Sequence, residues 1–453
     1  MQEHLVIIGG VAAGTKAAAK ARREKPDLKI SLYNEGEYVS YSECGLPYYI
    51  EGFFDNPKHL ISRTVERFKE ENIDIYIKHK VTKIIPDQKK IEVEKLETKE
   101  KIEVEYTKLL IATGASPVKP NIEGMDAENV YTIRTINDAV LIKDQIHNIK
   151  KAVIIGAGYI GVEMAEALYN QGINVTVLEL IDQILPPLDK DMADMIQKYL
   201  KEEKNLSVYT SDGLKKFIKD KNGKVNKVEI NSGQIIDTDL VIVAVGVKPN
   251  IELAKLAGIE IGITGTIKVN EKMQTNIPDI YAAGDCAEQT NIITGRPTWI
   301  PLGSTANKQG RVAAINITGG TALFKGILGS HVTKIFDCTI TKTGIGEKEA
   351  KNLGYDYIAS VISHRDRAGY MPDARNITIK LIAERQTGKL LGSQIIGQGD
   401  ADKRINVVAA ALTSGMTVDD LADVDLTYGP AYSSSIDPLL IAAQVLQNKF
   451  RKY

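Results

Sequence analysis

Short apolar runs alternate with helix-like stretches along most of the chain, as in proteins built around parallel sheets. Residues 4–8 and 152–155 are apolar runs, and each is followed by a glycine-rich loop and a segment with helical character, 15–25 and 162–170. Further apolar runs follow at 29–33 and 174–178. The repeated strand, loop, helix and strand predict two dinucleotide-binding units in one chain.

The rest of the pattern predicts how these units are connected. Apolar runs at 109–117 and 240–249 contain Ala-Thr-Gly (112–114) and Ala-Val-Gly (244–246), which we interpret as crossings between domains. Beyond residue 325, β-rich runs (331–341, 377–383) precede helical segments (403–414, 438–448). We therefore predict an α/β protein with two Rossmann-like domains and an α+β C-terminal domain. The expected domains are 1–115 with 250–325, 116–249, and 326–453.

Composition narrows the functional classes. The 453 residues are 43% hydrophobic and 25% charged with a net charge of −1, so a general nucleic-acid binder is not expected. No apolar run approaches the roughly 20 residues that span a bilayer, and the start lacks signal-peptide features. Three cysteines cannot form a disulfide framework, so we expect a reducing cytoplasm. The six histidines are scattered and predict no metal site.

The second glycine loop carries the strongest motif. Gly156, Gly158 and Gly161 have the G-x-G-x-x-G spacing between an apolar run and a helical segment, and Glu179 ends the next apolar run. Such a loop brings a pyrophosphate onto a helix N-terminus, and the acid accepts hydrogen bonds from the ribose. Glu179 would repel a 2′-phosphate, which favours NADH over NADPH. The alternative is a coincidental glycine-rich turn. The candidate residues of this site are Gly156, Gly158, Tyr159, Ile160, Gly161, Glu163, Glu179 and Gly246.

The first glycine loop is less regular, because Val11 occupies the middle glycine position and Asn34 or Glu35 the acid position. A third segment, 275–285, ends in Gly284-Asp285 after a short apolar run. A carboxylate there can accept a hydrogen bond from a flavin ribityl hydroxyl, although a strand that simply stops at Gly-Asp is the alternative. The candidate FAD residues are Gly9, Gly10, Ala13, Gly14, Asn34, Glu35, Ala112, Thr113, Gly114, Gly284 and Asp285.

With these motifs in this order, the whole chain resembles the flavoprotein disulfide reductases that bind two dinucleotides. The segment 40–48, Ser-Tyr-Ser-Glu-Cys-Gly-Leu-Pro-Tyr, resembles their single-cysteine branch. That branch contains coenzyme A disulfide reductases, persulfide and polysulfide reductases, and NADH oxidases and peroxidases. The coenzyme A disulfide reductases are the nearest subgroup. Glu43 departs from the asparagine that usually precedes the cysteine, and a carboxylate there is expected to raise the pKa of Cys44 unless it points away.

The resemblance implies FAD and NADH as cofactors and a redox role for Cys44. A single cysteine beside a flavin must form its sulfur–sulfur bond with an external group, such as coenzyme A or a persulfide sulfur. A buried inert cysteine is the alternative. Cys286 and Cys338 lack a partner at a redox-motif spacing, and we interpret both as structural.

A basic face on the first helix suggests the substrate. Lys16, Lys20 and Arg23 follow one another at helical spacing, and cations there suit the phosphates of coenzyme A; an ordinary solvated face is equally compatible. Arg67 is a further candidate contact. The predicted substrate residues are Lys16, Lys20, Arg23, Ser40, Glu43, Arg63, Asn307 and Arg311.

Two tyrosines complete the predicted catalytic set through the resemblance. Tyr370 and Tyr428 match tyrosines that coenzyme A disulfide reductases contribute from the partner subunit, so a homodimer is expected. Their motifs depart from the usual ones, so closing a loop is the alternative, and Tyr432 is a possible substitute for Tyr428.

Two rival functions stay open. Peroxidase relatives carry a histidine in the first glycine loop, and residues 9–14 contain none, which leaves an NADH oxidase as the main enzymatic rival. An NADH-driven electron-transfer or redox-sensing flavoprotein, with Cys44 idle, is the other.

Overall fold

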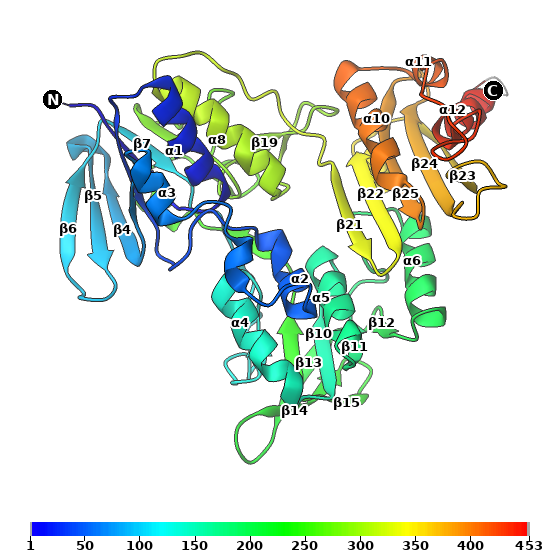
Figure 1. The fold of residues 1–453 in the computed structure, drawn as a ribbon, viewed down its shortest axis with the longest axis horizontal. Coiled ribbons are helices and arrows are strands. Elements are labelled where there is room, and N and C mark those ends of the chain that lie inside the picture. The colour runs from blue at the N-terminus through cyan, green and yellow to red at the C-terminus, as the bar shows by residue number, and fades with distance from the viewer. Residues whose placement is uncertain (1, 451–453) are drawn as a thin grey trace.

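The computed structural model describes residues 2–450, and Figure 1 shows two sheet-centred lobes below and beside a C-terminal lobe. Parallel sheets with helices packed on them confirm the predicted α/β class. Along these residues, no helix is both long enough and apolar enough to cross a bilayer.

The first sheet brings together strands from distant parts of the chain. Its order is β18-β7-β1-β2-β3, all parallel. Helices α1 and α8 pack closely, and Gly310 of α8 allows this approach. A Cβ at Gly310 would lie 2.4 Å from the carbonyl oxygen of Ala13. The elements are β1 (His4–Ile8), α1 (Ala12–Glu24), β2 (Lys29–Tyr33), α2 (Leu46–Glu51), α3 (Val65–Glu70), β3 (Asp74–Tyr76), β7 (Lys108–Ile111), α7 (Glu252–Leu256), β18 (Ile280–Ala282) and α8 (Gly303–Ile317).

The second sheet repeats the same plan in the order β12-β11-β10-β16-β9. Its elements are β9 (Val130–Tyr131), α4 (Ile136–Gln145), β10 (Lys151–Ile155), α5 (Tyr159–Asn170), β11 (Asn174–Leu178), α6 (Lys190–Glu202), β12 (Ser207–Tyr209) and β16 (Leu240–Val243). The continuous apolar strands β10 and β16 are fully buried except for the first residue of β10.

The two apolar runs 109–117 and 240–249 are each broken into two strands. Both breaks contain a glycine with positive φ, 66° at Gly114 and 113° at Gly246. Beyond the breaks, β8 (Ala115–Pro117) and β17 (Val247–Pro249) pair antiparallel with each other. The chain therefore crosses between the two sheets in both directions at one place, as predicted.

Three smaller antiparallel sheets flank the two large ones and were not predicted. They contain β4 (His79–Ile85), β5 (Lys90–Lys95) and β6 (Lys101–Glu105); β13 (Leu214–Lys219), β14 (Val225–Ile230) and β15 (Ile235–Asp237); and β19 (Gln289–Thr290) with β20 (Pro297–Thr298).

The C-terminal part is an antiparallel sheet, β21-β22-β25-β24-β23, with helices on it. The predicted run 331–341 is a hairpin whose turn includes Phe336 at φ 54°. The elements are β21 (His331–Ile335), β22 (Cys338–Gly344), α9 (Glu347–Asn352), β23 (Tyr357–Arg365), β24 (Asn376–Glu384), β25 (Leu390–Gly397), α10 (Ala401–Ser414), α11 (Val418–Ala422) and α12 (Pro438–Phe450). This mixture confirms the predicted α+β character, while the residue limits of the three domains stay a prediction.

A buried lysine joins the C-terminal sheet to the second lobe. The Lys380 side chain is 1% exposed, and its Nζ lies 2.7 Å from Asp191, 3.1 Å from Asp189 and 2.5 Å from Glu347. The three carboxylates also lie close enough to one another to hold a cation, but the ammonium group already neutralises part of their charge. We therefore interpret the cluster as an electrostatic link between domains.

Candidate active site

The first glycine loop is held by close packing within the protein. A Cβ on Gly9 would lie 2.1 Å from the Ala112 carbonyl oxygen, and one on Gly14 would lie 1.9 Å from the Gly9 carbonyl oxygen. The Gly10 N–H donates to the side-chain oxygen of buried Asn34 at 3.0 Å. Asn34 thus shapes the loop.

The two candidates at the acid position of this loop differ in their surroundings. The Asn34 amide donates to the carbonyls of Gly36 and Tyr38, both at 3.1 Å, so its hydrogens are already used. Glu35 is exposed and forms an ion pair with Lys80 at 2.8 Å. Contact of either residue with a ribose stays a prediction.

The second glycine loop divides its glycines between two roles. A Cβ on Gly161 would lie 1.9 Å from the Gly156 carbonyl oxygen, whereas a Cβ on Gly158 would meet nothing within 4 Å. Gly161 is therefore required by the close packing within the loop. Gly158 leaves open space where a pyrophosphate can approach the backbone. Within residues 2–450, no side-chain oxygen caps the start of α1 or α5, so their first amides are available to phosphates.

Glu179 is bound to this loop. The buried carboxylate accepts hydrogen bonds from the N–H groups of Ala157 at 2.8 Å and Ile181 at 3.1 Å. The acid is thus held at the end of β11 beside the glycine loop, where a ribose is expected. Ile160, by contrast, is exposed on the first turn of α5.

Hydrogen bonds hold the predicted flavin segment and the neighbouring Ala-Thr-Gly segment in place. Asp285 follows β18, and its backbone carbonyl accepts from Trp299 Nε1 at 2.8 Å, while the Gly284 N–H donates to Gln309 at 2.9 Å. Thr113, after β7, donates its hydroxyl to the Asn250 carbonyl at 2.7 Å. The carboxyl ends of adjacent strands β1, β7 and β18 thus carry the Gly9, Ala112–Gly114 and Gly284-Asp285 segments together, an arrangement that fits FAD.

Cys44 lies in a short 3-10 turn, Glu43–Gly45, directly before α2. The residue is exposed, in contrast to Cys286 and Cys338, which are buried. Burial raises the pKa of the Cys286 thiol. Burial also raises the pKa of the Cys338 thiol, to about 12, and both shifts agree with structural roles.

Arg134 connects the cysteine turn with the predicted flavin aspartate. Its Nη1 lies 3.0 Å from a Glu43 carboxylate oxygen, and its Nη2 lies 3.1 Å from an Asp285 oxygen. The sequence analysis missed Arg134, which lies between β9 and α4 in no recognised motif. The bridge also explains how a carboxylate is tolerated before Cys44: Glu43 is turned toward a cation.

Charges around Cys44 act in opposing directions. Although Cys44 is exposed, the desolvation of its thiol by neighbouring groups raises the pKa of that thiol. The carboxylates of Glu163 and Glu43 raise this pKa further, and Arg134 lowers it. Burial also raises the pKa of Glu43 to about 7, against the effect of Arg134. Glu43 therefore titrates close to neutral pH, next to the Cys44 thiol.

Removing the Glu43 charge is expected to activate Cys44. In Glu43→Gln the like charge is lost while Arg134 remains, so the pKa of Cys44 falls and more thiolate is present at neutral pH. Anaerobic alkylation by iodoacetamide should become severalfold faster at pH 7.5, and the inflection in the plot of alkylation rate against pH should move to lower pH. Glu37→Gln, an exposed carboxyl paired with Lys78, is the matched control and should leave the profile unchanged. An inflection at the same pH as in the wild type, or at a higher pH, would contradict this electrostatic interpretation.

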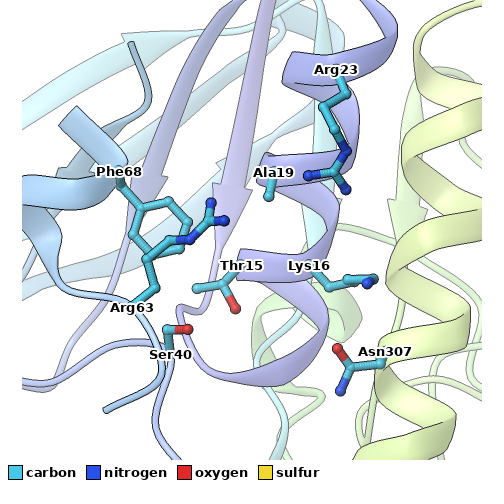
Figure 2. A pocket seen from close by; sticks show the side chains of 8 residues that line it. All are labelled: Thr15, Lys16, Ala19, Arg23, Ser40, Arg63, Phe68 and Asn307. Atoms are coloured by element: carbon cyan, nitrogen blue, oxygen red, sulfur yellow. The ribbon is translucent and has the colours of Figure 1, made fainter. Parts of the chain in front are cut away.

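Part of the predicted substrate set lines one cavity of about 180 Å³. Figure 2 shows Arg23 and Arg63 on either side of Ala19, and Lys16 beside Asn307 of α8. The space between these side chains is large enough for a phosphate group. The lining residues are Thr15, Lys16, Ala19, Arg23, Ser40, Arg63, Phe68 and Asn307.

Two of these lining residues are held by their surroundings. Arg63 forms an ion pair with Glu71 at 2.8 Å, and its guanidinium lies over the Phe68 ring, 4.9 Å from the centroid. Ser40 has φ 51°, and its N–H donates to the Gly10 carbonyl at 2.8 Å, which joins the cavity to the first glycine loop.

Other predicted substrate residues lie outside this cavity. Lys20 forms an ion pair with Glu24 on the same helix, and Arg311 of α8 does not line the cavity. Glu43 belongs to the Cys44 turn instead. The structure therefore gathers Lys16, Arg23, Ser40, Arg63 and Asn307, but not the other three.

The predicted catalytic tyrosines lie on the C-terminal domain. Tyr370, between β23 and β24, and Tyr428 and Tyr432, between α11 and α12, are all exposed. Figure 1 shows the β23–β24 loop on the opposite side of the molecule from α1. A contribution to catalysis would therefore have to reach the active site of a partner subunit.

The chain matches a known protein family over most of its length. The family described as pyridine nucleotide-disulphide oxidoreductase matches residues 3–310, and the dimerisation domain of such enzymes matches residues 331–439. The chain belongs to the pyridine nucleotide-disulphide oxidoreductases. It is thus an FAD-dependent oxidoreductase that uses a nicotinamide dinucleotide, as the two glycine loops indicated.

Individual relatives cover essentially the whole chain. An NAD(P)H coenzyme A polysulfide/persulfide reductase of Pyrococcus horikoshii is 40% identical over 99% of both chains. An NADH oxidase of Methanocaldococcus jannaschii is 39% identical over 97% of both. The solved structure of an NAD-dependent persulfide reductase from A. fulgidus superposes with a TM-score of 0.96 at 42% identity, covering 99% of this chain and 84% of that one. The predicted resemblance to the coenzyme A and persulfide branch is confirmed.

Proposed function

We propose that this oxidoreductase reduces a sulfur–sulfur bond carried by coenzyme A, as a persulfide, polysulfide or disulfide, through a mixed disulfide on Cys44. The observation that carries the proposal is the position of Cys44. It is the exposed cysteine of the described chain, and Arg134 joins the residue before it to the predicted flavin aspartate. The name of the Pyrococcus horikoshii relative supports this class of acceptor.

The chemistry follows from a single exposed thiol. The Cys44 thiolate attacks one sulfur of the substrate, a Cys44–S–S–R bond forms, and the substrate bond breaks to release a thiolate that takes a proton. FAD held at the first glycine loop would supply two electrons taken from the nicotinamide dinucleotide. These electrons break the Cys44–S–S–R bond into the Cys44 thiolate and a second thiolate, R–S⁻, which takes a proton and leaves. Arg134 holds the cysteine turn through Glu43, and its positive charge stabilises the Cys44 thiolate.

Substrate and cofactor selectivity belong to the same proposal. Lys16, Arg23 and Arg63 bind a phosphate of coenzyme A in the cavity, and Glu179 favours NADH over NADPH. Tyr370 and Tyr428 act from the partner subunit of a homodimer and stabilise the leaving thiolate. The reaction takes place in the reducing cytoplasm.

Oxygen reduction is the second candidate, because the Methanocaldococcus jannaschii relative is named an NADH oxidase. The two are separated by measuring NADH consumption by the FAD-loaded protein under anaerobic conditions with coenzyme A persulfide, polysulfide or coenzyme A disulfide, and then with oxygen alone. We expect fast anaerobic turnover with at least one sulfur acceptor. Turnover with oxygen alone, and none with sulfur acceptors, would overturn the proposal.

A further inference from the structure

Strand β21 of the dimerisation domain runs along helix α5, which begins at the second glycine loop. Two polar pairs connect them beyond the helix start: Thr333 donates its hydroxyl to Glu163, and Lys334 forms an ion pair with Glu166 at 3.0 Å. Glu166 is buried and Lys334 is half exposed, so this ion pair lies at the edge of the interface between β21 and α5. The dimerisation domain thus holds the dinucleotide helix along its length.

The third pair lies at the very start of the helix. The hydroxyl of Tyr159 is hydrogen-bonded to Nε2 of His331, and the two rings pack edge to face with centroids 4.5 Å apart. Tyr159 is the first residue of α5 and directly follows Gly158, the glycine with open space beside it. Any shift of Tyr159 therefore moves the amides at which a pyrophosphate would bind.

The second nitrogen of His331 fixes the direction of this hydrogen bond. Nδ1 lies 2.9 Å from the Gly329 carbonyl oxygen, which only accepts, so Nδ1 carries the proton. Burial lowers the pKa of His331 to about 4, so the ring is neutral and Nε2 is free to accept. Burial raises the pKa of the Tyr159 phenol, which therefore keeps its proton and donates.

Helix α5 also borders the cysteine site. It packs against α2, which continues from the Cys44 turn, and Glu163 is the charged group with the largest influence on the Cys44 thiol. Helix α5, which lies between β21 and α2, therefore begins at the dinucleotide loop and places the charge of Glu163 near Cys44.

We propose that His331 is a positioning residue for the nicotinamide dinucleotide: through Tyr159 it fixes the first turn of α5, and so makes dinucleotide binding depend on strand β21 of the dimerisation domain. The inference needs only that the chain binds this cofactor, and it holds for a sulfur reductase or an oxidase alike.

The test is NAD⁺ binding by the FAD-loaded protein, followed by calorimetry. His331→Phe keeps an aromatic ring but removes both ring nitrogens, and Tyr159→Phe removes only the hydroxyl. We expect each to raise the Kd for NAD⁺ by roughly three- to tenfold, the effect of one lost hydrogen bond, with FAD content unchanged. The double variant should lose no more than the worse single variant, because both remove the same bond.

A conservative variant and a control sharpen the result. His331→Gln offers a side-chain oxygen in place of Nε2 and should recover most of the affinity. The control is His147→Phe. His147 is an exposed histidine of the lobe that contains α5, and this variant should bind NAD⁺ like the wild type. In dye reduction, KM for NADH should rise while kcat changes by less than about twofold.

Two outcomes would overturn the proposal. One is an unchanged Kd in His331→Phe and Tyr159→Phe, whether or not their melting temperatures fall, because the bond would then serve stability alone. The other is additive losses in the double variant. If His331→Phe fails to fold, Tyr159→Phe and His331→Gln still decide the question.

Discussion

Gly158→Ala should bind NADH at least about tenfold more weakly while folding normally, and Gly161→Ala should be strongly destabilised. A methyl group at Gly158 meets no protein atom within 4 Å, and φ there is −72°, so alanine fits the free protein. The same methyl group occupies the path of the pyrophosphate to the backbone. At Gly161 the methyl group would lie 1.9 Å from the Gly156 carbonyl oxygen, which costs more than about 3 kcal/mol.

The pair of variants separates cofactor binding from packing at two glycines of one motif. Melting temperature and the Kd for NAD⁺ are measured on both proteins. Equal losses of stability, or normal NADH binding by Gly158→Ala, would show that the open space beside Gly158 is not where the dinucleotide approaches.

Cys44→Ser should reduce NADH-driven sulfur reduction by on the order of a thousandfold or more, the scale of loss on removing a catalytic nucleophile. A serine hydroxyl cannot form a sulfur–sulfur bond, so no mixed disulfide accepts the flavin electrons. Electron flow from NADH to an artificial dye should persist, because the two dinucleotide sites do not depend on the thiol. The measurement is steady-state NADH oxidation under anaerobic conditions with each acceptor.

Cys338→Ala is the matched control for this loss. Its sulfur is buried near the start of β22, with a pKa raised by burial, and its removal should leave most of the sulfur-reducing turnover intact. Comparable turnover by Cys44→Ser and wild type would instead favour the electron-transfer interpretation, in which Cys44 is idle.

The features that the sequence predicted well are those with local signals. Both Rossmann-like sheets followed from continuous apolar strands. The glycine loops, Asp285 and Cys44 could be chosen as candidates because each lies in a short motif whose residue spacing reports backbone geometry, and their roles stay predictions. The small sheet β4-β5-β6 lacked such a signal, because its strands mix exposed lysine and glutamate with a few buried positions.

The features that were missed depend on contacts between distant segments. Arg134 reaches Glu43 and Asp285 from another lobe, and no local pattern marks an arginine that pairs across a domain boundary. Lys380 is likewise buried only because carboxylates from elsewhere surround it. Lys20 is different, because Glu24 lies four residues further along the same helix, at the spacing of an i,i+4 ion pair. The sequence analysis considered only the cations of this helix and overlooked that pairing.

The central claim is that Cys44 carries an external sulfur group, and mass spectrometry of the intact protein and its peptides tests it most directly. The FAD-loaded protein is incubated anaerobically with coenzyme A disulfide, quenched in acid and digested, with and without a subsequent pulse of NADH. We predict a coenzyme A adduct on the peptide that contains Cys44, discharged by NADH and missing in Cys44→Ser. An unmodified Cys44 peptide, or an adduct that NADH does not remove, would contradict the mechanism.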